Sequence, residues 1–248
     1  MTVTLLHLAL PLGSVLNSFS DAVDFILHPQ AAQTGGTEVG GVGYIWPFVR
    51  THLEVSGLAL AGSLVVSLPI GLWLGHRGRG ELFAVALGNA GRAVPELAVI
   101  AFLAAFIGVG LQNVTIALMV LGIPPILTNT FVAVRQVDPD AVQAATGMGM
   151  RGPQVLARVE LPLAASTIMS GVRTAAINIV ATATIAPLAG VSTLGELILG
   201  RDVYGSDGVL AGAILVALLA LIVELTLAGL QRLVTPRGLI LQRASAGA

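Results

Sequence analysis

Long apolar stretches constrain this chain more than any other feature of its sequence. Five of them, each of about 20 residues or more, cover residues 52–75, 81–108, 113–134, 163–187 and 208–233. A helix of about 20 apolar residues crosses the roughly 30 Å hydrocarbon core of a bilayer. Only 10% of the residues are charged, whereas soluble domains carry roughly 25%. We therefore predict an all-α polytopic membrane protein with five transmembrane helices.

Small residues favour helices over a membrane β-barrel. The chain contains 30 Gly, and small side chains let transmembrane helices approach one another closely. Gly57 with Ala61, and Gly71 with Gly75, each stand one helical turn apart and predict a packing face on the first span. A barrel would require strands of about ten residues with alternating polarity, and the sequence has no such pattern.

Composition also limits the chemistry of the chain. It has no Cys, its net charge is −1, and all 12 of its basic residues are Arg. A Walker A phosphate loop needs a Lys, so any ATP used by this protein must be bound by another chain. The four His are scattered, which argues against a metal site, and a chain without excess positive charge offers no face for nucleic acid.

The N-terminal part differs from the rest. Apolar residues recur at helical spacing through residues 3–28 but are interrupted by polar ones such as Asp21 and Asp24. This pattern predicts a helix lying in the membrane interface, with an extra span over 3–20 as the alternative. Residues 29–43 read as a Gly-rich linker. We divide the chain into an N-terminal segment, 1–49, and a transmembrane domain, 50–240.

Arginine placement predicts the orientation of the chain in the membrane. Arg77 and Arg79, the polar insert 135–162 and the C-terminal tail all fall on one side of a five-span arrangement. Basic residues are enriched in cytoplasmic loops. This side is therefore expected to be cytoplasmic, and the N-terminus is expected outside unless residues 3–20 cross.

The insert 135–162 is the one long polar segment between spans. Asp138 precedes Pro139, which is the pattern of a capped helix start. Gly149 can adopt a left-handed conformation and end that helix. Gly152-Pro153 begins a second short helix that runs to Glu160, and Pro162 opens the fourth span. We predict a helix–turn–helix that continues into the membrane.

The insert resembles the EAA loop of ABC importer permeases. Gln143-Ala144-Ala145, three residues, Gly149, nine residues, Val159, one residue and Leu161-Pro162 reproduce its spacing, with Gln143 in place of the family Glu. In that family the loop docks in a groove of an ATPase. The resemblance thus implies a coupling loop whose key residues are Asp140, Gln143, Ala144, Ala145, Gly149, Met150, Arg151, Arg158, Glu160, Leu161 and Pro162.

Other motifs are similar to those of permeases for quaternary-amine osmoprotectants. They include residues 92–95, 122–127, 147–150, 159–163 and 171–175, whereas Ser192-Thr193-Leu194-Gly195 departs from the usual Gly-rich turn. The resemblance implies a type I, methionine-importer-like fold and import of glycine betaine, choline, carnitine or proline betaine. Another small solute such as an amino acid, or an ATP-independent carrier, is the alternative.

The same resemblance implies the partners of the chain. These are an ATPase dimer that holds ATP and Mg²⁺, a second permease in a homodimer or heterodimer, and an extracytoplasmic binding protein, all in a lipid bilayer. The chain itself would carry no cofactor and would not be an enzyme. Aromatic cages hold quaternary ammonium groups tightly. Because aromatic residues make up only 4% of the chain, we expect tight recognition in the binding protein.

Polar and proline residues within the spans are expected to face protein or water, because a charge at a helix centre costs about 2.5–3.5 kcal/mol on insertion scales. Pro95 predicts a bend and Pro124-Pro125 a kink. Arg92 and Glu96 are read either as a structural pair or as path-lining residues, and Asn178 with Thr182 either line the path or bond between helices. The candidate path residues are Arg92, Pro95, Glu96, Asn129, Asn178 and Thr182.

Two further charges are expected to be structural. Arg173 is placed to brace the insert through Glu160 or Asp140, and Glu224 lies about two turns from Arg232.

Overall fold

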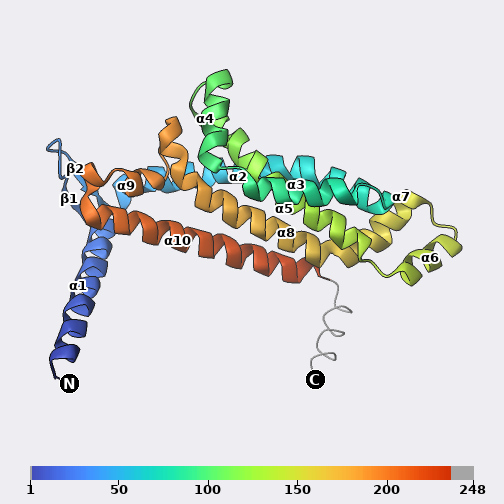
Figure 1. The fold of residues 1–248 in the computed structure, drawn as a ribbon, viewed down its shortest axis with the longest axis horizontal. Coiled ribbons are helices and arrows are strands. Elements are labelled where there is room, and N and C mark those ends of the chain that lie inside the picture. The colour runs from blue at the N-terminus through green and yellow to red at the C-terminus, as the bar shows by residue number, and fades with distance from the viewer. Residues whose placement is uncertain (1, 236–248) are drawn as a thin grey trace.

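The computed structural model describes residues 2–235, with the side chains of 15–235 except those of residues 85, 89, 90 and 92. The chain is almost entirely helical, as predicted (Figure 1). Its elements are α1 (Thr2–Leu27), β1 (Pro29–Ala31), β2 (Glu38–Gly40), α2 (Gly41–Arg77), α3 (Glu81–Ala93), α4 (Glu96–Ile107), α5 (Leu111–Arg135), α6 (Pro139–Gly147), α7 (Gly152–Val155), the π-helix η1 (Leu156–Glu160), α8 (Leu161–Thr182), the 3₁₀ helix η2 (Ala183–Ala189), α9 (Gly195–Leu199) and α10 (Arg201–Val234).

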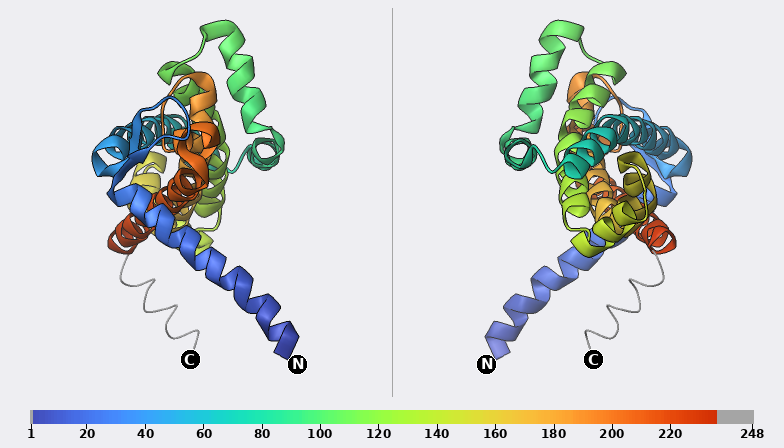
Figure 2. Two further views of the ribbon diagram at one scale, coloured as in Figure 1. Left: turned by 90° about the vertical axis from the view of Figure 1, so that its left-hand side faces the viewer. Right: turned by 90° about the vertical axis from the view of Figure 1, so that its right-hand side faces the viewer.

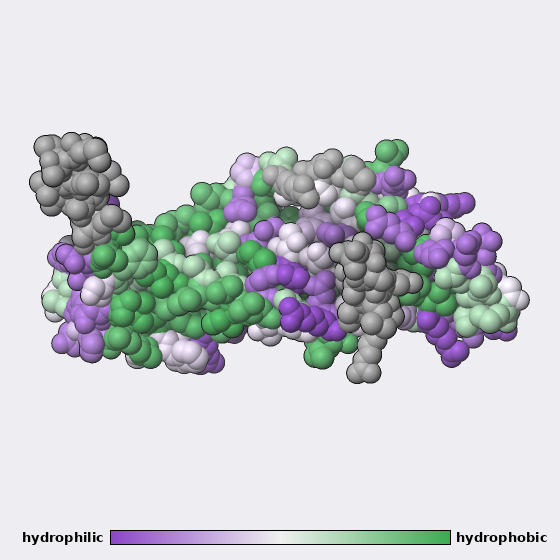
Figure 3. Space-filling model, turned by 90° about the horizontal axis from the view of Figure 1, so that it is seen from below, coloured by the Kyte–Doolittle hydropathy of each residue, from purple (hydrophilic) through white to green (hydrophobic). Residues whose placement is uncertain are grey.

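Four helical segments of the described chain are long and apolar enough to cross a membrane. They are Gly41–Arg77, Leu111–Arg135, the continuous rod Gly152–Ala189 and Arg201–Val234. These correspond to the first, third, fourth and fifth predicted spans. They run side by side along the long axis of the molecule, with α6 and α7 at one end and the β1–β2 hairpin and α9 at the other (Figure 1). A broad apolar band with more polar residues towards both ends of the bundle is visible in Figure 3.

The second predicted span, 81–108, is not one bent helix. It consists of α3 and α4, which are separated at Val94 and Pro95. Pro95 has φ −66° and ψ 123°, which is extended backbone, and a residue before proline is itself disfavoured in the α conformation. α4 stands away from the bundle in Figures 1 and 2. The proline therefore breaks this helix rather than bending it.

α5 lies at the centre of the bundle, between α2 and α8. On the α2 side, a Cβ added at Gly71 would come 2.8 Å from Cβ of Thr130, and one added at Gly75 would come 2.8 Å from Cβ of Val134. The predicted Gly71/Gly75 packing face is thus confirmed. Gly57 has nothing within 4 Å of such a Cβ and is exposed together with Ala61, so this pair forms no packing face in the described chain.

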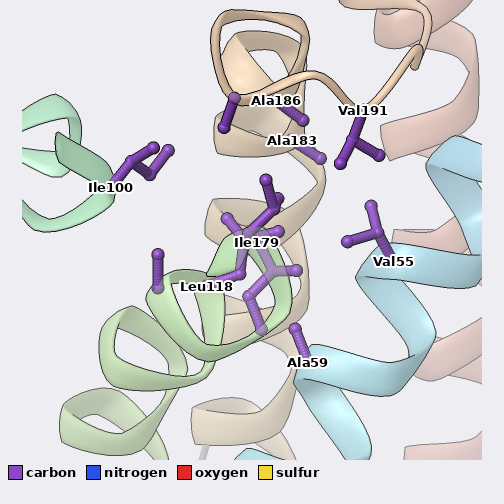
Figure 4. Close-up of a cluster of buried hydrophobic side chains, with 11 residues drawn as sticks. Val55, Ala59, Ile100, Leu118, Ile179, Ala183, Ala186 and Val191 are labelled. Atoms are coloured by element: carbon purple, nitrogen blue, oxygen red, sulfur yellow. The ribbon is translucent and has the colours of Figure 1, made fainter. Parts of the chain in front are cut away.

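The main core fills the space between α2, α5 and the η2 end of α8 (Figure 4). Val55 and Ala59 of α2 meet Leu118 of α5 and Ile179 of α8, and all four are fully buried. Ile100 is the buried side chain of α4 and packs at the edge of this cluster. With Val99 and Leu103, which also pack against this cluster, it anchors α4 to the bundle.

Polar groups tie the helices together where they touch. Ser63 of α2 donates to the carbonyls of Ala59 and Met119 at 2.8 and 3.1 Å, and Ser67 donates to the carbonyl of Ile123 at 3.2 Å. The bonds to Met119 and Ile123 cross from α2 to α5 beside Pro124 and Pro125, which have no N–H to donate. They satisfy groups that lipid cannot hydrogen-bond.

Arg173 does not brace the insert, and this prediction was wrong. Its guanidinium forms an ion pair with Glu224 of α10 and also donates to Oε1 of Gln231 at 2.5 Å. Arg173 and Glu160 belong to one continuous rod. Thirteen residues of helix separate them by about 20 Å along the axis. The structural role predicted for Glu224 is confirmed, and its partner is Arg173 on α8.

The Gly-rich segment after α1 forms a two-stranded antiparallel hairpin in place of the predicted linker, with Gln30 opposite Val39. Beside it, Tyr204 of α10 meets Tyr44 of α2, and their hydroxyl oxygens lie 3.2 Å apart. Phe25 of α1 packs edge-on against Tyr204. α1 then projects from this end of the bundle (Figure 2). The choice between an interfacial helix and a span over 3–20 depends largely on side chains outside the described ones.

We predict that Gly71→Val destabilises the protein, because the added side chain would collide with Thr130 and force α2 away from α5. Overpacking of this kind costs about 1–3 kcal/mol. A thermal unfolding scan of the protein purified in detergent should show a lower midpoint. Gly57→Val, whose new side chain meets open space, is the matched control, and an equal shift in both variants would contradict the packing argument.

Candidate functional site

The polar insert folds as its sequence predicts. The backbone N–H of Asp140 donates to Oδ1 of Asp138 at 2.9 Å, which caps α6. Gly149 has φ +85°, a left-handed conformation that glycine adopts at little cost. Beyond it the N–H of Met150 donates to the carbonyl of Ala145 at 3.2 Å, which closes the end of α6 as in a Schellman motif. The N–H of Arg151 donates to Oε1 of Gln154 at 2.8 Å and starts α7.

Burial divides the predicted coupling residues into two groups. Ala145 and Glu160 are buried, whereas Met150 and Pro162 are partly exposed. The remaining ones form an outward surface, which we call the insert face: Asp140, Gln143, Ala144, Gly149, Arg151, Arg158 and Leu161. Val142 packs against a cluster that includes Val134, Ala164 and Ile168. The insert is thus held to the bundle on one side and open on the other.

Met148 lies beside the insert face, and no coupling role was predicted for it. It is the residue before Gly149, and its side chain is 74% exposed. An apolar side chain at the tip of a polar turn is the signal that could have identified it. Exposed methionine is common on binding surfaces because its flexible side chain adapts to different partners.

A π-helical turn joins the insert to the membrane. The N–H of Leu161 donates to the carbonyl of Leu156, five residues earlier, and η1 lies within the continuous rod Gly152–Ala189. Pro162 explains this turn, because proline has no N–H and its ring would collide with the carbonyl four residues before it, that of Arg158. The predicted continuity between insert and fourth span is confirmed, and Pro162 lies inside one rod with a widened turn.

Glu160 is the last residue of this turn, and its carboxylate contacts a side chain that sequence spacing did not suggest. Its Oε2 atom lies 2.6 Å from Nδ1 of His76, in the last turn of α2. Nothing in the sequence between residues 76 and 160 indicates that they meet, because their contact depends on how α2 and α8 pack.

A polar cavity of about 310 Å³ lies between α3, α5 and α8. It brings together two of the predicted path residues, Asn129 and Asn178. The described residues that line it are Gly88, Gly91, Leu121, Pro124, Pro125, Thr128, Asn129, Thr174 and Asn178. None of these nine described residues is ionisable or aromatic.

Neutral oxygen atoms are among the polar groups of this cavity. Pro124 and Pro125 have no N–H, so the carbonyls of Val120 and Leu121 lose their usual helical donors, and Leu121 lines the cavity. The amide nitrogen of Asn129 donates to the carbonyl of Pro125 at 2.8 Å, which leaves its amide oxygen as an acceptor. The cavity therefore offers neutral acceptors to whatever enters it.

The other predicted path residues lie elsewhere. Pro95 and Glu96 line a separate recess with Ile185, and Thr182 is buried without lining the cavity. The side chain of Arg92 falls outside the described ones, so its pairing with Glu96 cannot be placed.

The turn after the fourth span is tightly built despite its departure from the usual Gly-rich pattern. The hydroxyl of Thr193 donates to the carbonyl of Ala183 at 2.7 Å. A Cβ added at Gly195 would lie 1.7 Å from the carbonyl oxygen of Thr184, so this position requires glycine. This one glycine keeps α9 against η2.

Comparison with known proteins identifies the family. Residues 67–237 match the family described as binding-protein-dependent transport system inner membrane component. The chain belongs to this family. Its members are transport subunits of ABC importers and are not enzymes, because a separate chain hydrolyses ATP. Within the described residues, no group of three or more His, Cys, Asp or Glu side chains is arranged to hold a metal ion.

Several curated permeases are similar to the chain over most of its length. It is 38% identical over 189 residues to the carnitine transport permease protein OpuCB of Listeria monocytogenes, covering 76% of this chain and 87% of that one. It is 34% identical, with the same coverage, to the glycine betaine/carnitine/choline transport system permease protein OpuCB of Bacillus subtilis. It is 35% identical to the osmoprotectant import permease protein OsmY of Salmonella typhimurium, covering 75% of this chain and 80% of that one.

Solved structures agree on the fold. The chain superposes on the inward-facing MetNI methionine ABC transporter with a TM-score of 0.68 and 20% identity, covering 79% of this chain and 98% of that one. An amino acid ABC transporter crystallised with histidines gives a TM-score of 0.59 at 18% identity, with 77% and 94% covered. The permease thus has the type I importer fold that was predicted from its sequence.

Proposed function

We propose that this permease passes a small quaternary-amine osmoprotectant of the glycine betaine, choline, carnitine or proline betaine class into the cytoplasm by alternating access. The names of its relatives carry the proposal, since carnitine, choline and glycine betaine permeases are 30–38% identical to it over about three quarters of its length. The methionine and amino acid transporters share the fold at no more than 21% identity, so they do not favour the amino acid alternative.

The polar cavity is the proposed translocation path. A quaternary ammonium group has no N–H to donate and carries a diffuse positive charge, so neutral oxygen acceptors suit it. The amide oxygen of Asn129, the side chain of Asn178 and the carbonyl of Leu121 would supply such acceptors. A site without an aromatic cage would hold the solute weakly, as a path must. Arg92, Pro95, Glu96 and Thr182 would line the path beyond this cavity.

The insert face is the proposed docking site for the ATPase. Its residues are exposed and mostly small or polar, and its first helix, α6, packs on the bundle through Val142. ATP and Mg²⁺ would be held entirely by a dimer of that ATPase. Gln143, in place of the family Glu, would contribute a neutral hydrogen bond, so docking would depend on the shape of α6 more than on one ion pair.

A second permease would complete the transporter. The chain is similar to both carnitine permeases of Listeria monocytogenes, OpuCB and OpuCD, which supports a pair of permeases, either identical or related. Alternating access then requires that each partner bind the two states of the pair with different affinity. ATP would favour one state and the loaded binding protein the other.

The proposed orientation puts the insert and the C-terminus in the cytoplasm. The exposed Arg77, Arg79, Arg135, Arg151 and Arg158 all lie at or near the insert end, and basic residues favour the cytoplasmic side. The opposite end, with the hairpin and α9, would then meet the extracytoplasmic binding protein. Residues 1–49 would form an outer segment with α1 in the interface, and 50–240 the permease domain in contact with lipid.

Uptake by the reconstituted transporter tests the substrate. Proteoliposomes that contain the permease, its ATPase and its binding protein should accumulate a labelled quaternary amine when ATP is inside. Asn178→Leu should lower this uptake about tenfold, because the cavity loses a polar group, while the ATPase remains bound. Thr226→Leu, an exposed position on α10 outside the cavity, is the control. Accumulation of amino acids instead of quaternary amines would refute the proposed substrate.

Co-purification of the ATPase tests the docking face. Gly149→Asp puts a charged side chain on the insert face at φ +85°, and we expect at least a tenfold loss of bound ATPase and of uptake. Gly35→Asp is a matched control, because Gly35 has φ +88° with nothing nearby and lies at the other end of the bundle. Wild-type assembly of the Gly149 variant would show that docking occurs elsewhere.

A further inference from the structure

One partly buried contact joins the widened turn of the rod to α2, the first long membrane helix. Nδ1 of His76 lies 2.6 Å from Oε2 of Glu160. Glu160 is only 6% exposed, although it belongs to the segment that leads out of the membrane. A buried carboxylate without a partner would be very costly. The imidazole N–H of His76 satisfies it from another helix.

The same histidine also borders the start of the insert's second helix. A Cβ added at Gly152 would lie 3.2 Å from Nε2 of His76. Gly152 begins α7 and Glu160 ends η1, so one imidazole borders both ends of this nine-residue segment. The contact therefore fixes the segment in position and not merely one side chain.

The segment needs such support because its backbone is weakened there. In η1 the N–H of Leu161 bonds five residues back, and Pro162 has no N–H to contribute. π-turns of this kind are rare and frequently occur at functional sites. A rod with a widened turn can bend at that turn, and a bend would absorb any movement applied to the insert.

We propose that His76 and Glu160 are positioning residues for energy coupling. Their contact holds the widened turn against α2, so that movement of the insert passes into α8 instead of being lost at the turn. α8 and α5 line the polar cavity, and α2 packs on α5 at Gly71 and Gly75. The movement thus reaches the cavity walls. This inference rests on the proposed docking of the ATPase at the insert face.

A pair of apolar substitutions separates a coupling role from a merely structural one. Replacing both members of a buried polar pair by apolar residues often preserves stability, whereas removing one member leaves the other unsatisfied. In the double variant His76→Leu with Glu160→Leu, the protein should therefore fold and bind the ATPase. It would lack the directional hydrogen bond that holds the turn.

The experiment compares solute transported per ATP hydrolysed in proteoliposomes that contain the ATPase and the binding protein. We expect the double variant to retain ATPase and hydrolysis but to lose at least tenfold in solute per ATP. The single variant His76→Gln keeps Glu160 and an N–H donor, so its ratio of solute to ATP should lie between those of the double variant and the unaltered chain. A wild-type ratio of solute to ATP in the double variant would overturn the proposal. So would failure of the double variant to bind the ATPase while the unaltered chain binds it.

A control variant and the unaltered chain distinguish the coupling role of His76 from the docking of the ATPase at the insert face. His28→Leu removes a similar contact, Nδ1 to Oδ1 of Asp24 at 2.8 Å, which is exposed and lies in the N-terminal segment. It should leave coupling unchanged, and a loss equal to that of the double variant would count against a specific role for His76. Failure of the unaltered chain to bind the ATPase would instead refute the docking proposal.

Discussion

The close approach of α5 to α2 and α8 governs how the helical bundle is built. Lipid tails are as apolar as the side chains that face them, so helices in a membrane gain little from burial and must gain from tight packing. Glycine makes this packing possible on both sides of α5, at Gly71 and Gly75 of α2 and at Gly171 of α8. A Cβ at Gly171 would lie 2.5 Å from Cβ of Asn129. The same contacts fix the walls of the polar cavity and the place where His76 meets Glu160.

Local chemistry explains why the insert could be predicted from the sequence. A cap at Asp138, a left-handed turn at Gly149 and a helix restart at Gly152 each depend on a few neighbouring residues. The long spans were equally accessible, since length and apolarity alone define them. Pro162 correctly indicated where insert and membrane helix join, but not that the junction would be a π-turn within one rod.

Predictions failed where they depended on how helices face one another. The partner of Arg173 is set by the packing of α8 on α10, and the partner of Glu160 by the packing of α2 on α8, neither of which leaves a trace in sequence spacing. Pro95 indicated locally that the helix would be interrupted. Whether a proline bends or breaks a helix depends on what the following helix can pack against, which the sequence does not show. Of the predicted path residues, Asn129 and Asn178 line one cavity because α5 and α8 pack closely. Glu96 lies on α4, which stands away from the bundle.

The position of the widened turn also sets how far the two ends of the rod would move relative to each other. The rod has 38 residues, Gly152–Ala189, and spans about 57 Å at about 1.5 Å per residue, nearly twice the hydrocarbon thickness of a bilayer. Its turn ends at Glu160, so the part beyond the turn is about three times as long as the part before it. A rod that pivots at this point moves its far end about three times as far as its near end, and in the opposite direction. A displacement of about 1 Å at the insert would become about 3 Å at η2.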